Sequence, residues 1–339
     1  MRGGLAQRRL TLVALWLATV AMNPAAADTL ADVRERGFLR CGLIEGSPGY
    51  STLNDKGERV GFDIDHCKTI SAAVFGKVSI EYVPITPNTV FTLLQSGGID
   101  IFPGGATWSF TRDTTMGLDF TGVYMWAGQG FVVHKSTGVT RVAELDGATI
   151  CVAQGTTLEQ NLADYFDANN LRYTAITFAD IDKGLQAYRA DRCDAFTNER
   201  VSTAGRISVW PDRDEHVILD EVISKEPMAA LVRQGDARWR DIALWSFNAR
   251  IAAEELGINQ ANVARMRAES ANQEVRRLLG VQGNFGEKLG LSNDWAYDII
   301  RIVGNSEDMW NRHFAPLGVS RGLNRTWRDG GLMSALPFR

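Results

Sequence analysis

The chain has 339 residues, of which 22% are charged, and its formal net charge is −4. With 40 acidic residues against 36 basic ones, neither nucleic acid nor an anionic membrane surface is expected as the main partner. The length is enough for two lobes, each with its own hydrophobic core.

The first 27 residues have the pattern of a cleaved signal peptide. Three arginines precede an apolar run over residues 10–21, and three alanines follow at 25–27. The apolar run is shorter than the roughly 20 residues that a membrane-spanning helix needs. We therefore expect export, and a mature chain that starts at Asp28 with a net charge of −7.

All four cysteines lie in the part that is expected to be exported. An even number of cysteines in an oxidising compartment favours two disulfides over free thiols. The positions suggest one pair in each lobe, Cys41–Cys67 and Cys151–Cys193, but the sequence leaves other connectivities open. Because no Cys-x-x-Cys occurs and the four histidines are scattered, neither a metal site nor a cofactor is expected.

The first part of the exported chain alternates strands with helices. Strands are predicted at 38–44, 78–85 and 99–102, with helices at 65–75 and at the segment that ends at Gly98. This alternation is typical of a parallel sheet flanked by helices.

The same plan recurs in the middle of the chain. Strands are predicted at 148–153, 172–178 and 193–196, with helices that begin at Thr157 and cover 183–188. The two stretches share a pattern and not a sequence. They predict an α/β fold of two lobes, each a mostly parallel sheet flanked by helices.

Two extended passages, 122–133 and 216–224, separate these parts. If both cross between lobes, lobe 2 is an insertion at 128–224, and lobe 1 comprises 28–127 together with 225–339. Two such crossings form a hinge, and ligands favour the cleft between hinged lobes. Later helices at 238–255 and 294–303 carry aromatic residues that we expect to pack against lobe 1 and not to form a binding surface.

Three polar positions follow the carboxyl ends of strands, where α/β sheets bind ligands. Thr156 and Thr157 begin a helix after Gly155, and either can open a capping box, with Glu159 or Gln160. Such a helix start attracts an anion, although an ordinary helix cap that binds nothing is the alternative.

The other two positions follow the strands that end at Phe102 and Asn198. After Phe102 come Thr107 and Arg112, which together can hold a carboxylate. Alternatively, Arg112 pairs with Asp113 or Asp119. The carboxylate of Glu199 can pair with a ligand ammonium group, or it can only stabilise the first turn of the next helix.

These segments resemble the periplasmic general amino-acid-binding proteins of ABC transporters, within the type II solute-binding group. The resemblance covers essentially all of the mature chain. Its most specific segments are 54–58, 61–67, 155–157, 161–166, 223–227, 253–258 and 291–296.

The resemblance implies a periplasmic monomer that serves an inner-membrane ABC permease and binds an amino acid or a related zwitterion. Arg112 and Thr107 would hold the α-carboxylate with the helix start at Thr156, Glu199 would receive the α-ammonium, and loop 45–50 would face the ligand side chain. The implied ligand-binding residues are Tyr50, Gly105, Thr107, Trp108, Arg112, Thr156, Thr157 and Glu199.

Two departures from the family affect specificity. Family members usually carry Arg-Asn-Thr-Thr-Trp-Thr where this chain has the six residues Gly104–Ser109, so a cation, an amide and a hydroxyl are missing. Glu199 replaces the usual aspartate and moves its carboxylate by about 1.5 Å, roughly one C–C bond. Because specific hydrogen bonds determine which ligand such a site accepts, the broad specificity of the family does not transfer directly.

Two other functions use the same scaffold. An enzyme similar to the cyclohexadienyl dehydratases would use Glu199 as a general acid. A sensory or orphan binding protein would bind a ligand without transport. We favour a binding protein for transport, because the sequence offers no activated nucleophile, no metal cluster and no second well-placed acid.

Overall fold

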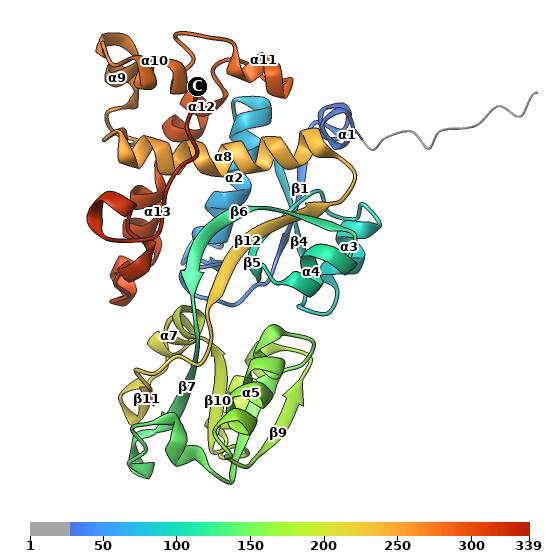
Figure 1. The fold of residues 1–339 in the computed structure, drawn as a ribbon, viewed down its shortest axis with the longest axis vertical. Coiled ribbons are helices and arrows are strands. Elements are labelled where there is room, and N and C mark those ends of the chain that lie inside the picture. Colours follow the sequence, from blue (N-terminus) through green and yellow to red (C-terminus); the bar gives the residue numbers. More distant parts are fainter. Residues whose placement is uncertain (1–27) are drawn as a thin grey trace, which may run out of the picture.

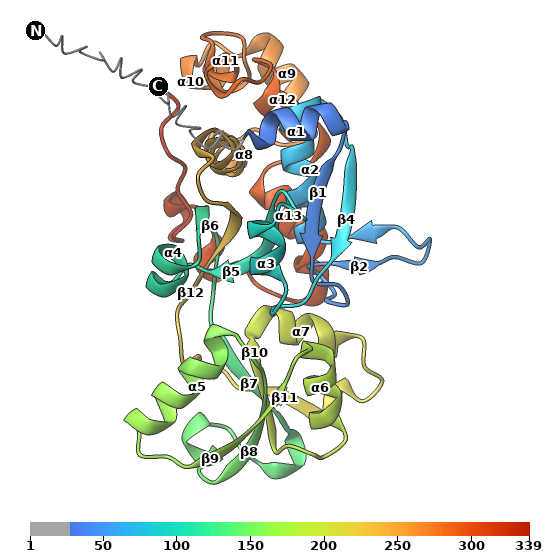
Figure 2. The same ribbon diagram turned by 90° about the vertical axis from the view of Figure 1, so that its right-hand side faces the viewer.

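The computed structural model describes residues 28–339, and Figures 1 and 2 show two bodies joined by extended chain crossings. The predicted signal peptide lies outside the described residues. Among residues 28–339, no helix is both long and apolar enough to span a bilayer.

The upper body in Figure 1 contains the strands that come first along the chain, together with β12. Strands β1 (Leu39–Leu43) and β4 (Ile80–Pro84) are parallel, and an isolated parallel bridge joins Cys41 to Ile101. Antiparallel strands follow in the order β5-β12-β6, with bounds Phe102–Thr107, Glu226–Arg233 and Leu118–Ala127. A small hairpin, formed by β2 (Thr52–Leu53) and β3 (Arg59–Val60), projects beside them. The helices of this part of the chain are α1 (Thr29–Arg36), α2 (Phe62–Phe75), α3 (Val90–Gln95) and α4 (Phe110–Thr115).

The lower body contains a five-stranded sheet in the order β11-β7-β10-β8-β9. The predicted alternation of strands and helices is confirmed here, since β8 is parallel to both β9 and β10. The strands next to the crossings, β7 and β11, add antiparallel pairs, because the chain enters and leaves this body through them. The bounds are β7 (Gln129–His134), β8 (Ala148–Ala153), α5 (Thr157–Ala168), β9 (Tyr173–Phe178), α6 (Ile181–Arg189), β10 (Ala195–Glu199), α7 (Arg200–Ser208) and β11 (His216–Ile218).

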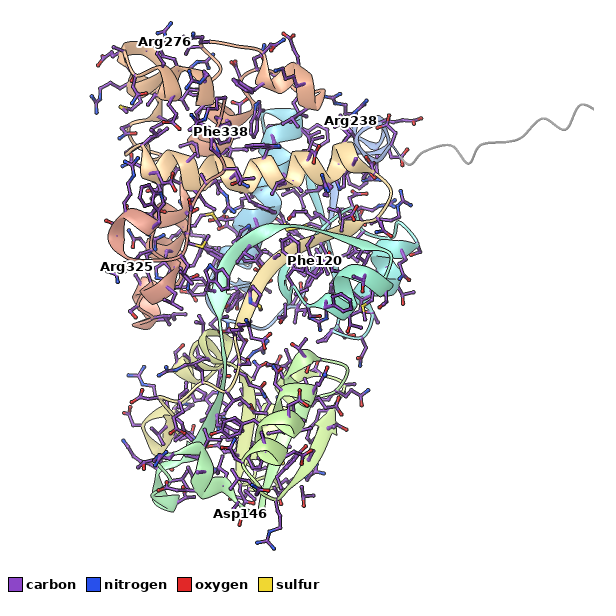
Figure 3. All side chains as sticks on the ribbon, viewed as in Figure 1. Phe120, Asp146, Arg238, Arg276, Arg325 and Phe338 are labelled. Atoms are coloured by element: carbon purple, nitrogen blue, oxygen red, sulfur yellow. A yellow bond between two sulfur atoms is a disulfide. The ribbon has the colours of Figure 1, made fainter. Side chains whose placement is uncertain are left out.

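The C-terminal part forms helices that cover the upper body. The longest, α8 (Ala237–Glu255), lies across β6 and α2 in Figure 1, and Phe338 packs against Trp245 of α8 (Figure 3). Trp239, Trp295 and Trp310 are buried in the core, so these aromatic residues pack as predicted. The remaining helices are α9 (Val263–Glu269), α10 (Gln273–Leu278), α11 (Phe285–Leu289), α12 (Trp295–Ile302) and α13 (Ser306–His313).

Each body has its own buried apolar clusters. The buried members of the upper clusters fall within residues 30–125 and 229–338, and those of the lower clusters within residues 131–219. We therefore keep the proposed boundaries, with lobe 1 at 28–127 and 225–339 and lobe 2 at 128–224.

The two disulfides pair as the cysteine positions suggested. Cys41–Cys67 joins β1 to α2 in lobe 1, and Cys151–Cys193 joins β8 to the segment before β10 in lobe 2. Each bridge therefore fixes a strand to its neighbour within one lobe.

Candidate ligand-binding site

A cavity lies between the two lobes and is lined by both of them. It has about 870 Å³ of space, open solvent at its mouth included. All the predicted ligand-binding residues except Trp108 line it: Tyr50, Gly105, Thr107, Arg112, Thr156, Thr157 and Glu199.

Trp108 is a correction to the prediction, because it does not line this cavity. Successive side chains of an extended chain point to opposite sides, so Thr107 faces the cavity and Trp108 turns away. The indole ring is 38% exposed and stacks on Phe120, which Figure 3 places in the upper body, at a centroid distance of 5.2 Å.

Strand β5 runs through the segment that was expected to lie beyond a strand ending at Phe102. Its partner is β12, with Thr107 opposite Met228 and Ala106 opposite Ala229. The register of this pair shifts after Ala229, and Gly105 has a φ of +72°, a conformation that glycine adopts without strain. This strand pairing is what holds Thr107 at the cavity wall.

Arg112 lies on α4 and reaches back toward the strand. Its Nη1 donates to the carbonyl oxygen of Thr107 at 3.2 Å, and its guanidinium lies over the ring of Phe91. Burial lowers the pKa of Arg112. Within residues 28–339 it forms no ion pair, so the alternative pairing with Asp113 or Asp119 is not formed. The half-buried guanidinium lines the cavity and can therefore receive a ligand carboxylate through two hydrogen bonds.

The start of α5 is confirmed at Thr157, but neither predicted capping box forms. Thr156 is the N-cap residue, yet its hydroxyl donates to the carbonyl oxygen of Ala153 at 2.7 Å and makes no cap hydrogen bond. Glu159 accepts from the N–H of Gly155 instead. The Thr156 side chain thus leaves the first-turn N–H groups uncapped beside the cavity, which favours an anion there.

Glu199 ends β10 and also caps α7, so both predicted roles are compatible. Its Oε1 accepts from the N–H of Val201 at 2.8 Å, and its Oε2 accepts from the N–H of Ser202 at 2.7 Å. The hydroxyl of Tyr50, from lobe 1, donates to the same Oε2 at 2.9 Å. Burial raises the pKa of Glu199, although these three hydrogen bonds oppose the shift. The arrangement places a buried carboxyl opposite Arg112 in the lining of one cavity.

Glu226, which sequence reasoning missed, contacts both lobes. It is the first residue of β12 and is 2% exposed. Its Oε2 accepts from the hydroxyls of Thr107 in lobe 1 and Thr157 in lobe 2, the latter at 3.2 Å. Its Oε1 accepts from Asn161 Nδ2 at 2.6 Å and from the Ser224 hydroxyl at 2.7 Å. Glu226 could have been suspected, because it falls in the family-like segment 223–227.

Asp63 and Arg206 also line the cavity and were not predicted. Arg206 forms an ion pair with Asp182 and donates to the carbonyl oxygen of Gly46 at 3.1 Å. Asp63 has a buried Oδ1 without a hydrogen-bond partner in the described part of the chain. Burial first, and then the charge of Glu199, raise the pKa of Asp63 to about 8.

The lobes approach each other closely at two further points, as in a closed cleft. The Ser47 and Ser202 hydroxyls lie 3.3 Å apart. A Cβ at Gly155 would lie only 2.4 Å from Asn88 Oδ1, so a larger residue there would have to displace the Asn88 side chain. For metals, residues 28–339 contain no group of three or more His, Cys, Asp or Glu side chains that could hold an ion.

The family model of bacterial extracellular solute-binding proteins, family 3, matches residues 39–280. The chain belongs to this family. Members are solute-binding proteins, and the two lobes around a lined cavity are consistent with that description.

Three relatives cover nearly the whole chain. The glutamate/glutamine/aspartate/asparagine-binding protein BztA of Rhodobacter capsulatus is 46% identical over 95% of this chain and 97% of its own length. The general L-amino acid-binding periplasmic protein AapJ of Rhizobium johnstonii is 43% identical over 94% of this chain and 95% of its own. A periplasmic binding protein from Brucella ovis, solved with glutathione bound, has a TM-score of 0.89 and 44% identity, covering 92% of this chain and all of that one.

Proposed function

We propose that this chain is the periplasmic solute-binding component of an ABC transporter and that it captures an α-amino acid or a related small zwitterion. The single observation that carries the proposal is the pairing of opposite charges in one cavity. Arg112 and the uncapped start of α5 supply a site for a carboxylate, and Glu199 supplies a site for an ammonium group.

Capture would use the hinge between the lobes. Tyr50 and Thr107 belong to lobe 1, whereas Glu199 and Thr157 belong to lobe 2, so a bound zwitterion would contact both lobes only when they are closed. A ligand that binds the closed form more tightly shifts the equilibrium between open and closed forms toward the closed one. The closed monomer would then deliver its ligand to an inner-membrane permease.

An enzyme with Glu199 as general acid is a second candidate, supported by the raised pKa of this buried carboxyl. Three donors face the Glu199 carboxylate, and hydrogen bonds of this kind stabilise the anion over the acid. We therefore favour an ammonium partner over a proton donor. A sensory binding protein would have the same site and would differ only in its membrane partner.

The test is titration calorimetry on the mature chain, residues 28–339, with a panel of L-amino acids, followed by mass spectrometry of the recovered ligand. Arg112→Ala should weaken carboxylate binding by about a hundredfold or more, since two charged hydrogen bonds are lost. Arg265→Ala is the matched control, because Arg265 is exposed and remote from the cavity lining. Undiminished affinity in Arg112→Ala would refute the assigned site, and chemical conversion of the ligand would indicate an enzyme.

Uptake separates transport from sensing. Deleting the gene should abolish uptake of the radiolabelled ligand by cells, and a plasmid copy should restore it. Normal uptake in the deletion strain, with binding intact in vitro, would favour the sensory function.

A further inference from the structure

One carboxyl in the cavity wall has no partner to balance it. Asp63 lies in the first turn of α2, is 3% exposed and lines the cavity. Its Oδ1 accepts no hydrogen bond from any described residue, and the Asp63 carboxylate forms no ion pair within residues 28–339. A buried carboxylate is costly unless a cation or several donors face it.

Gly104 lies beside Asp63 on the cavity wall. A Cβ placed on Gly104 would lie 3.3 Å from Asp63 Oδ2, so the backbone of β5 approaches the carboxyl closely. The same Cβ would lie 2.5 Å from the ring of Phe102, so an apolar ring occupies the place where a side chain would leave the strand.

The other charged groups of the cavity have their own partners or roles. Glu199 and Glu226 each accept several hydrogen bonds, and Arg206 is paired with Asp182. Arg112 is the remaining cation of the lining, and the proposed function assigns it to the ligand α-carboxylate. Among the acidic groups of the lining, Asp63 is therefore the one whose carboxyl has no assigned partner in residues 28–339.

We propose that Asp63, which lines the cavity beside Gly104, is the subsite for a second cationic group of the ligand, so that the ligand is a basic amino acid or a close derivative. The inference rests on the proposed function, since it assigns the α-carboxylate to Arg112 and the α-ammonium to Glu199. Apolar residues of the lining, among them Ile44, Val90 and Phe102, would contact the alkyl chain between the two charged ends of such a ligand.

Binding at this subsite releases a proton. With a pKa of about 8, set by burial and then by the charge of Glu199, Asp63 is mostly protonated in the free protein at pH 7. Tyr50 and Tyr124 also interact with it, and both stay neutral because burial raises their pKa. A cation against Asp63 favours its ionised form, so the carboxyl proton passes to the buffer as the ligand binds.

The experiment compares ligands that differ in this one charge. Calorimetry on the mature chain uses arginine against citrulline and lysine against norleucine, with glutamate and glutathione as acidic alternatives. The wild-type protein should prefer the cationic member of each pair by at least about tenfold, because close buried charge pairs contribute well over 1.4 kcal/mol. Titrations in buffers of different ionisation enthalpy should show close to one proton released per cationic ligand.

Asp63→Asn keeps the shape of the side chain and removes the charge. It should reduce the affinity ratio between the cationic and the neutral ligand of each pair to about one, and it should abolish the proton release. The preference ratio and the proton count of the wild-type protein test the proposal even if the variant fails to fold. Equal or better binding of the neutral or acidic ligands, with loss of that binding in Arg112→Ala, would overturn the subsite and leave the proposed function intact. Failure of every amino acid and of glutathione to bind would overturn both.

Discussion

Two aspartates on one helix show how local partners decide the state of a buried carboxyl. Asp65 is two residues after Asp63 on α2, and both are buried. Burial alone would raise the pKa of Asp65, but the hydrogen bond from His313 and the charges of Lys68 and Arg312 lower it to about 2. Asp63 has no such partners and its pKa rises to about 8. The sequence pattern Asp63-Ile64-Asp65 gives no hint of this difference, because two of the three partners of Asp65, Arg312 and His313, come from α13.

The first prediction concerns acid stability. A carboxyl whose pKa falls from 3.8 to about 2 on folding stabilises the protein above pH 4, and this stabilisation is lost as the pH falls toward 2. The wild-type free energy of unfolding should therefore fall between pH 4 and pH 2 by roughly 2 kcal/mol more than that of Asp65→Asn. Urea unfolding at several pH values measures the difference.

Asp63→Asn is the matched control for this prediction. The Asp63 carboxyl of the wild-type protein has a raised pKa, so the wild-type protein loses stability as the pH rises from about 4 to 8. Asp63→Asn lacks this carboxyl and should therefore be the more stable protein at pH 8. Parallel pH profiles for the wild-type protein and Asp65→Asn would contradict the role of the Asp65 pairs.

At the scale of elements, the sequence predicted what local patterning determines. Strand β8 has its predicted bounds, 148–153, and α5 starts at Thr157, because an apolar run followed by Gly155 and two threonines is a local signal. A strand was predicted at 99–102, whereas β5 begins at Phe102 and runs to Thr107. Its continuation depends on a ladder to β12, more than 100 residues later, and no local pattern shows such a pairing.

The positions of the candidate site residues could likewise be predicted only where a local pattern determines them. Thr107, Arg112 and Glu199 line the cavity as expected, and the strand that ends at Glu199 was located from its local pattern. Trp108 was misplaced, since its side depends on the extension of β5. Asp63 and Glu226 were missed because their meaning depends on which distant side chains they face.

The disulfide of lobe 2 provides the prediction at this scale. Cys151–Cys193 closes a segment of 42 residues between β8 and the start of β10. In the chain-entropy description, such a bridge stabilises the folded state by about 4 kcal/mol, mainly by restricting the unfolded chain. Replacing both cysteines by alanine should lower the calorimetric melting temperature while leaving Cys41–Cys67 intact.

Peptide mapping without reductant checks that the second bridge survives in that variant. The matched variant lacks Cys41 and Cys67 instead. Its melting temperature should fall slightly less, because that bridge closes a segment of 26 residues. An unchanged melting temperature in either variant would mean that the bridge adds nothing to stability.

At the scale of the whole molecule, one carboxylate beside the hinge links the two lobes. Glu226 begins β12, the strand by which the chain returns to lobe 1, and it accepts hydroxyl hydrogen bonds from Thr107 and Thr157 on opposite lobes. These are hydroxyls that we expected to be free for the ligand. Glu226 therefore holds the cleft closed with the same donors that surround the proposed carboxylate site.

The last prediction follows from this arrangement. Glu226→Gln keeps the shape but cannot accept all four hydrogen bonds, and losing one charged hydrogen bond costs about 1.5–3 kcal/mol. The ligand-free equilibrium should move toward the open form by roughly tenfold or more, and X-ray scattering should report a larger radius of gyration. Saturating ligand should bring the variant and the wild-type protein to the same compact value. Glu45→Gln is the control, because Glu45 pairs with Arg59 inside lobe 1 and spans no cleft. If Glu226→Gln scatters like the wild-type protein without ligand, Glu226 does not control closure, and the hinge strands themselves must set the resting geometry.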